Sequence, residues 1–251
     1  MVRRHSPITP VALRSAAHCS IPEQRKLLGQ SPYLTGLTED EVNQVQRTFQ
    51  QQHYDAGDFI QKAGEPAIRL SIVGAGFVKV VRPTMDGQDV LLDILGPGEH
   101  FGSLAELGDA SYREDVVALT DCCILYTNAD NFHEILQRFP AAALSTLELV
   151  AARLRGAQSS IEHLSAYPVD RRVSSTLLHL AAKIGRVHET GFLIDVPLSR
   201  QDIADMTGAK VETVSRVLSD FRRRGLIASG RRWIAVIDRE GLADIAGSDM
   251  P

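Results

Sequence analysis

The stretch from Leu198 to Ile227, LSRQDIADMTGAKVETVSRVLSDFRRRGLI, most constrains the fold because it encodes two short helices around one glycine. Ser199 stands where a helix N-cap is expected, and Gly208 closes the first apolar repeat. A second helical repeat runs on to Gly225. Its expected buried face consists of Val211, Val214, Leu218 and Phe221.

Elements on both sides extend this pair of helices into a recognisable motif. RRVSSTLLHLAAKIG has the pattern of an amphipathic helix that ends at Gly185, and GFLIDVP has the composition of a strand. LIASGRRWIAVID predicts a hairpin that turns at Ser229-Gly230. Helix, turn with glycine, helix and hairpin is the order of a winged helix-turn-helix.

The second helix of this motif carries polar residues opposite its apolar face, namely Glu212, Ser215 and Arg216. Such a helix enters the major groove of DNA, where Glu accepts from cytosine and Arg donates twice to guanine. We therefore predict that these three residues contact base edges. The alternative is a surface ion pair between Glu212 and Arg216, worth about 0.5 kcal/mol at most, but this pair would not explain the turn and the wing. Residues predicted to contact phosphates are Arg200, Lys210, Thr213, Arg222 and Arg231.

A long helical segment before this motif, residues 140–165, has apolar residues at alternating steps of three and four. This heptad spacing is typical of a helix that packs against a partner helix, and it predicts a dimer. The alternative is that the helix packs only on its own domain. The predicted dimer seam consists of Leu147, Val150, Leu154, Ala157, Ile161 and Leu164.

The preceding region alternates short β-rich runs with turns, and we expect a roll of short strands without helices between them. FVKVVRP and DVLLDIL flank Asp86-Gly87, which predicts a hairpin. LTEDEVNQVQRTF predicts a short helix with a capping box of Thr38 and Glu41. The predicted parts are an N-terminal extension (1–20), a sensing β-roll (21–139), a dimerisation helix (140–165) and a DNA-binding domain (166–251), an α+β fold.

Charge and composition fit this division of the 251 residues. Residues 166–247 carry a net charge of +3 and residues 1–165 a net charge of −6, which suits a polyanionic partner at one end. No apolar run is long enough to span a bilayer, and three cysteines provide no disulfide framework, so we expect a cytoplasmic protein. We expect no enzyme activity and no metal site, because Gly-rich phosphate loops, nucleophile elbows and metal-ligand motifs are all missing from the sequence.

From about Ile21 onward the chain resembles the CRP/FNR family of bacterial transcription regulators. GFVKVVRPTMDGQDVLLDILGPGEHFG is similar to that family's effector-binding, cyclic-nucleotide-binding-like jelly roll, and VAARLRGAQSSIEHL to its dimer helix. VETVSR is similar to the FNR branch, which implies base-reading roles for Glu212, Ser215 and Arg216 on a TTGA-type half-site. The resemblance implies a homodimer on palindromic double-stranded DNA, with RNA polymerase as a partner. It fits an activator, although the residues do not separate activation from repression.

We do not expect the β-roll to bind the effector of either main branch of the family. An FNR-type iron-sulfur cluster needs four cysteines, mostly near the N-terminus, where only Cys19 lies. The cAMP cassette needs a Glu and an Arg, but FGSLAELGDASYRED has Ser103 and Tyr112 at those places, with Arg113 one residue late and acidic residues after it. The candidate effector pocket residues are Gly102, Ser103, Tyr112, Arg113 and Gln158.

Other signals stay open at this point. Haem could be held by a histidine, and a divergent cyclic nucleotide or no ligand at all are further alternatives. Thiol oxidation could act at Cys122 or Cys123, which are neighbours on a predicted strand, so we expect one in the core and one near the surface. A different function would be a small-molecule-binding module that docks protein in place of DNA. The candidate haem ligands are His18, His53, His100 and His133.

Overall fold

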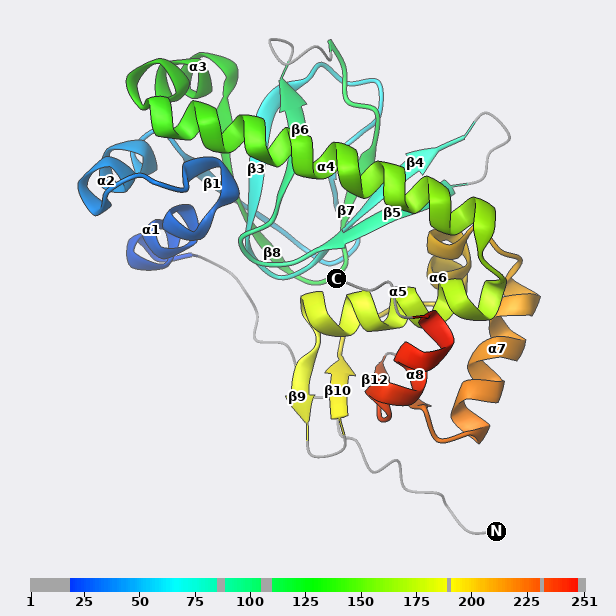
Figure 1. Cartoon of the computed structure of the whole chain (residues 1–251). Helices are drawn as coiled ribbons and strands as arrows, with labels where there is room; N and C mark the ends of the chain where they lie inside the picture. The colour runs from blue at the N-terminus through cyan, green and yellow to red at the C-terminus, as the bar shows by residue number, and fades with distance from the viewer. Residues whose placement is uncertain (1–18, 85–88, 105–109, 189–190, 231–232, 248–251) are drawn as a thin grey trace. The chain divides into compact units, whose positions relative to one another are not determined.

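The computed structural model describes residues 19–84, 89–104, 110–188, 191–230 and 233–247, without the side chains of 153 and 159–164. The chain divides into two compact units, and the boundary between Ser160 and Ile161 falls inside one helix, α4 (Pro140–Ala166). Figure 1 shows the strands of the first unit and the helices α5 to α8 of the second. No described helix is both long enough and apolar enough to cross a membrane.

The first unit contains a roll of two antiparallel four-stranded sheets, with strand orders β1-β8-β3-β6 and β2-β7-β4-β5. The predicted Asp-Gly hairpin is confirmed, because Pro83 pairs with Asp89 across it. Side chains from both sheets form one apolar core that includes Val73, Val78 and Ile124. The strands are β1 (Gln50–Tyr54), β2 (Phe59–Gln61), β3 (Ile68–Ala75), β4 (Val78–Pro83), β5 (Asp89–Leu95), β6 (His100–Leu104), β7 (Asp115–Ala118) and β8 (Cys122–Asn128).

Helices precede and follow this roll, and only one of them was expected. In α2 (Glu39–Gln46) the predicted capping box is present: the Thr38 N–H donates to Glu41 at 2.8 Å. Two further helices, α1 (Ile21–Gln30) and α3 (Ala129–Arg138), were not predicted, and they lie before and after the strands and not between them. They form because their apolar sides complete a second core with residues of the 3-10 turn η1 (Pro32–Leu34), α2 and β3.

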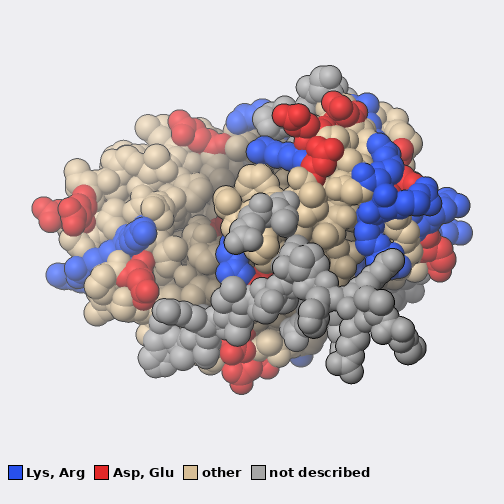
Figure 2. Space-filling view, turned by 90° about the horizontal axis from the view of Figure 1, so that it is seen from below, with Lys and Arg blue, Asp and Glu red and all other residues tan. Residues whose placement is uncertain are grey.

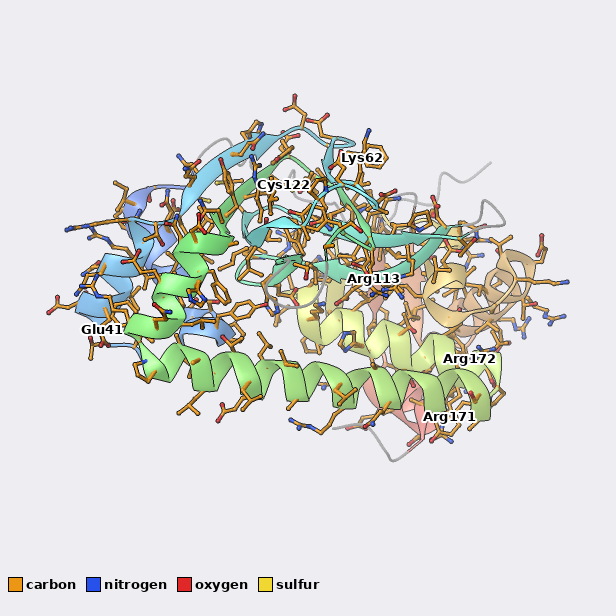
Figure 3. All side chains as sticks on the ribbon, turned by 90° about the horizontal axis from the view of Figure 1, so that it is seen from above. Glu41, Lys62, Arg113, Cys122, Arg171 and Arg172 are labelled. Carbon is orange, nitrogen blue, oxygen red and sulfur yellow. The ribbon has the colours of Figure 1, made fainter. Side chains whose placement is uncertain are left out.

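Helix α4 buries one side against the first unit and leaves an apolar side open. Ser145 is buried and donates to the Thr35 carbonyl at 2.7 Å. On the other side Leu147, Val150 and Leu154 are 66%, 56% and 62% exposed. Side chains stand out from the described part of α4 in Figure 3. The helix therefore packs on its own domain and still presents the predicted seam to solvent. The side chains of two seam residues, Ile161 and Leu164, lie outside the described part.

The second unit packs α5 (Val169–Ile184) against three other helices and a small sheet of order β11-β12-β10-β9. The expected end of α5 at Gly185 is confirmed. In the hairpin Ser229 pairs with Ile234, so the turn spans Gly230 to Trp233 and is wider than the predicted turn at Ser229-Gly230. The other elements are β9 (Arg186–His188), β10 (Gly191–Ile194), α6 (Arg200–Thr207), α7 (Val211–Arg223), β11 (Ile227–Ser229), β12 (Ile234–Val236) and α8 (Arg239–Ala246).

Candidate nucleic-acid interface

The turn between α6 and α7 is defined by local hydrogen bonds and one glycine. The Ser199 side chain caps α6 and accepts from the Asp202 N–H at 3.0 Å, while the Asp202 carboxylate accepts from the Ser199 N–H at 2.7 Å. Gly208 ends the helix with a φ of 57°, a left-handed conformation that glycine adopts without a steric penalty. Both ends of α6 are thus fixed, and the direction in which α7 leaves the turn is fixed with them.

Helix α7 has one buried and one open face, as its spacing predicts. Val214, Leu218 and Phe221 are buried in the second unit. Glu212 and Arg216 are exposed on the opposite side, and Ser215 is half-buried. Among the residues that the structure describes, Glu212 and Arg216 form no ion pair with each other. The three predicted base-reading residues therefore lie on a helix whose apolar side anchors it and whose polar side is available to a partner.

Basic side chains surround α7 and give this end of the unit a positive surface. Figure 2 shows Lys and Arg gathered along the right-hand edge of the molecule, the side on which α6 and α7 lie in Figure 1. Arg223 and Arg224 are paired with Asp220 of the same helix. Arg231 lies outside the described residues, and Thr213 is only partly exposed. The exposed cations around the helix pair are Arg200, Lys210, Arg216, Arg222, Arg223 and Arg224.

A groove runs between α6, α7 and the β11-β12 hairpin. Its walls combine apolar residues at the base with polar side chains at the rim, including Arg200, Ser219 and Arg222. At its hairpin end Gly230 makes room for the Trp233 indole, which an added side chain would meet. Ser229, Gly230 and Ile234 of the hairpin therefore line the same groove as residues of α6 and α7.

The predicted effector residues differ in their surroundings. Tyr112 is buried, and its hydroxyl accepts hydrogen bonds from the backbone N–H of Arg69 at 2.9 Å and of Ile68 at 3.3 Å. Arg113 and Gln158 are exposed, whereas Gly102 and Ser103 lie on β6 and are partly buried. Tyr112 therefore fastens its loop to β3, and its hydroxyl is already occupied by the backbone of the chain.

This role of Tyr112 predicts a stability effect. Tyr112→Phe removes the hydroxyl and leaves the Arg69 N–H without that acceptor, so the free energy of unfolding should fall by about 1 kcal/mol. Urea unfolding, followed by circular dichroism, measures the difference from the unchanged chain. A variant that is equally stable or more stable would show that the hydroxyl does not anchor the loop.

The acidic residues that follow are also engaged by the chain. Glu114 forms an ion pair with Arg82 of β4. Asp115 accepts a hydrogen bond from the Ala63 N–H at 2.7 Å. Their charges thus hold neighbouring loops of the roll in place, a role that a search for ligand-binding motifs does not reveal.

The two adjacent cysteines are both buried, so the expectation that one lies near the surface is wrong. Cys122 is 0% and Cys123 is 1% exposed. Cys122 lies within the roll (Figure 3), and its thiol donates to the Phe77 carbonyl at 3.3 Å. Burial raises the pKa of this thiol. Cys123 points to the other face of β8, where Cys19 and the Gln51 side chain lie beside its sulfur.

Three of the four candidate haem ligands lie within the described residues. His53 lies 3.2 Å from Asp55, and His133 lies 2.7 Å from Gln137 on its own helix. His100 is buried with its ring edge-on to Tyr33, and His18 lies outside the described residues. Within the described ranges, no three His, Cys, Asp or Glu side chains come together as a metal site would require.

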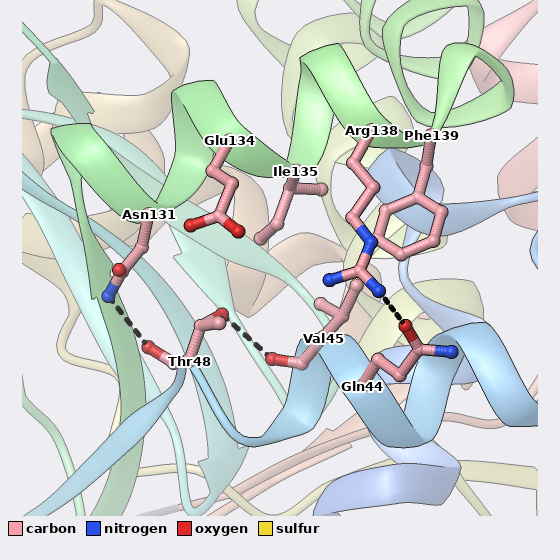
Figure 4. Close-up of a pocket in the computed structure, with 8 residues that line it drawn as sticks. All are labelled: Gln44, Val45, Thr48, Asn131, Glu134, Ile135, Arg138 and Phe139. Carbon is pink, nitrogen blue, oxygen red and sulfur yellow. Dashed lines mark hydrogen bonds between the residues drawn. The ribbon is translucent and has the colours of Figure 1, made fainter.

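A shallow hollow in the first unit lies between α2 and α3 (Figure 4). Its polar groups already bond across it: Asn131 donates to the Thr48 carbonyl at 3.2 Å, and Arg138 donates to Gln44 at 2.6 Å. These bonds join α3 to α2 and to the segment that follows α2, which is a structural role.

These observations define a class of protein, a DNA-binding regulator with an attached sensor domain, and comparison with known proteins gives its family. Residues 51–139 match the cyclic nucleotide-binding domain model, and residues 171–245 match the Crp-like helix-turn-helix domain model. The transcriptional regulator LdrP of Thermus thermophilus is 34% identical over 190 residues, 74% of this chain and 92% of that protein. The chain belongs to the CRP/FNR family, and it is a transcription regulator of that type.

Two further relatives extend this likeness. The CRP-like cAMP-activated global transcriptional regulator of Mycobacterium tuberculosis is 27% identical over 218 residues, which cover 87% of this chain and 97% of that protein. The structure of FixK2 from Bradyrhizobium japonicum matches with a TM-score of 0.71 at 24% identity, over 80% of this chain and 99% of that chain. The predicted α+β fold, with a β-roll and a C-terminal helix-turn-helix, is confirmed.

Proposed function

We propose that this regulator binds a palindrome of TTGA-type half-sites as a homodimer, with one α7 helix in each of two successive major grooves about 34 Å apart. The observation that carries the proposal is the position of Glu212 and Arg216, exposed on the face of α7 opposite its buried side. A planar guanidinium that is free in this way can donate to both O6 and N7 of one guanine.

Phosphate contacts then set the register of the two helices. Arg200 and Arg222 lie at the rim of the groove beside α7, where a DNA backbone would pass. Lys210 stands directly before α7 and provides no side-chain cap, and its carbonyl accepts from the Thr213 and Val214 N–H groups, which leaves the first N–H groups of the helix, those of Val211 and Glu212, for a phosphate oxygen. Thr213 and Arg231 complete the proposed set of phosphate contacts.

Dimerisation uses the open apolar side of α4. Leucine and valine side chains that are more than half exposed cost free energy in water, and pairing two copies of the helix would bury them. Their steps of three and four match the packing of one helix against its twin. The same arrangement would place two identical DNA-binding units for a palindromic site.

The β-roll is the proposed sensor, and its signal would act by shifting the equilibrium between two arrangements of the dimer helices. RNA polymerase is the proposed partner at the promoter. Since the DNA of a bacterium lies in the cytoplasm, the protein would act there. A ligand-binding module that docks protein is the weaker alternative, because it does not account for the polar outer face of α7.

Selection of bound sequences from a random pool of duplex DNA tests the base-reading proposal. We expect enrichment of two inverted TTGA half-sites whose centres lie about one helical turn apart. Enrichment of unrelated sequences, or no enrichment over the starting pool, would contradict it. The same selection with the variant Arg223→Ala should return the same motif, because Arg223 is paired with Asp220.

cAMP is not the expected signal, although proteins similar to this one are named for it. The place of the phosphate-binding arginine is held by Tyr112, whose hydroxyl is bonded to β3. We therefore expect cAMP to leave the thermal unfolding midpoint unchanged. A saturable rise would contradict this, because a ligand that binds only the folded state raises the midpoint with its concentration. It would favour a divergent nucleotide site in which Arg113 holds the phosphate.

A further inference from the structure

Two cysteines that are far apart in the sequence have adjoining sulfur atoms. Cys19 precedes α1, and Cys123 lies on β8. A Cβ atom added to Gly74 would lie 2.6 Å from the Sγ of Cys19 and 3.5 Å from the Sγ of Cys123. The two side chains also share a hydrogen bond. Gly74 sits at the register shift between Val73 and Ala75, and its missing side chain leaves the space in which the two thiols meet.

The pair is enclosed by polar groups of neighbouring elements. Gln24 of α1 donates to the Cys19 carbonyl at 2.9 Å and to the Gln51 side chain at 3.1 Å. The Cys123 thiol points at the same Gln51 oxygen at 3.7 Å. This network holds the start of α1 against β1 and β8, so both sulfurs stay in place.

The third cysteine is separate from this pair. Cys122 is next to Cys123 on β8, but its side chain points to the other face of the strand and bonds to the carbonyls of Phe77 and Thr120. An adjacent-residue disulfide would require both sulfurs on the same side. The geometry therefore selects Cys19 as the partner of Cys123.

We propose that Cys19 and Cys123 are an oxidation site, which a peroxide converts into an intramolecular disulfide that fastens the start of α1 to β8. In the first step one sulfur attacks a peroxide oxygen, the O–O bond breaks, and with hydrogen peroxide a sulfenic acid and one water form. In the second step the other sulfur attacks the sulfenic sulfur and forms the S–S bond, while the S–O bond breaks. The departing hydroxyl takes the proton of the attacking thiol and leaves as a second water. Two thiols are oxidised and one peroxide is reduced.

The environment determines how readily this happens. The hydrogen bond with Cys123 and burial raise the pKa of the Cys19 thiol, so the thiolate is scarce and the reaction is slower than at an exposed cysteine. The sulfenic acid is nevertheless enclosed beside a second thiol, which favours a disulfide over further oxidation.

The test is peroxide treatment of the purified full-length chain, followed by alkylation in denaturant and peptide mass mapping without reductant. We expect a Cys19–Cys123 linked peptide that dithiothreitol abolishes, with Cys122 still alkylated. Cys122→Ser is the matched control and should form the same link. The proposal would be overturned if Cys19 or Cys123 were found in a disulfide with any other cysteine. It would also be overturned if both residues were still alkylated after a treatment that oxidises exposed thiols in a reference peptide.

A second variant tests the geometry without removing either cysteine. Gly74→Ala puts a methyl group where the two sulfurs meet and should slow formation of the link several-fold relative to the unchanged chain. Thermal unfolding of the reduced variant shows whether it is folded, and only a folded variant is compared. Formation at an unchanged rate in folded Gly74→Ala would show that the sulfurs do not meet beside Gly74, and would overturn this assignment.

Discussion

Replacing Leu147 and Leu154 together by lysine should convert the proposed dimer into a folded monomer that has lost most of its affinity for the palindrome. The two side chains are 66% and 62% exposed within one chain, so the substitutions leave the core of the first unit intact. In the dimer they would meet their own copies, and four lysines in that seam would repel one another. A monomer contacts only one half-site at a time, so the loss of the second, connected DNA-binding unit should weaken binding to the palindrome by a factor of about 10² to 10⁴.

Sedimentation equilibrium measures the mass of this variant, and fluorescence anisotropy measures its affinity for labelled palindromic DNA. Glu148→Lys is the matched control, because it changes the charge of α4 by the same amount at an exposed position beside the seam. The control should remain a dimer. If the double variant also remained a dimer at micromolar concentration, α4 would not be the dimer interface.

Arg216→Ala should make the free energy of binding to the TTGA palindrome less favourable by about 1–3 kcal/mol for each half-site. It should also relax the preference for one base pair in each half-site. The guanidinium is exposed on α7, so its removal leaves the fold unchanged. A contact to a base edge distinguishes sequences, and its loss should reduce the affinity for the palindrome far more than the affinity for unrelated DNA.

Competition with palindromes substituted at each base pair measures this change of preference. Arg223→Ala removes the same side chain from the same helix, but Arg223 is paired with Asp220, and we expect a small effect that is equal for all sequences. An Arg216→Ala protein that kept both full affinity and full discrimination would mean that another residue reads the base.

The local signals of the second unit could be predicted because each element is determined by its own residues. Ser199 caps α6, Gly208 takes the left-handed conformation, and the apolar side of α7 is buried. The capping box of Thr38 and Glu41 belongs to the same kind of signal. Such features need only a few neighbouring residues, so the sequence pattern predicts them well.

Features that depend on distant contacts could not be predicted. Helix α1 is a different case, because its capping box of Ser20 and Glu23 is a local signal that makes this helix predictable. The burial of Cys122 depends on the core between the two sheets, and the burial of Cys123 goes with the segment around Cys19, about a hundred residues away in the chain. The role of Tyr112 depends on β3, more than forty residues away in the chain. Periodicity contains no information on such pairings.

The most direct test of the central claim is a titration of the unchanged protein with a TTGA palindrome and with a shuffled duplex over a series of salt concentrations. We predict that both affinities fall steeply as salt rises, because phosphate contacts release counterions, and that the palindrome is bound more tightly throughout. Binding that is absent, that does not respond to salt, or that is equal for the two duplexes would contradict the assignment of α7 as a helix that contacts bases.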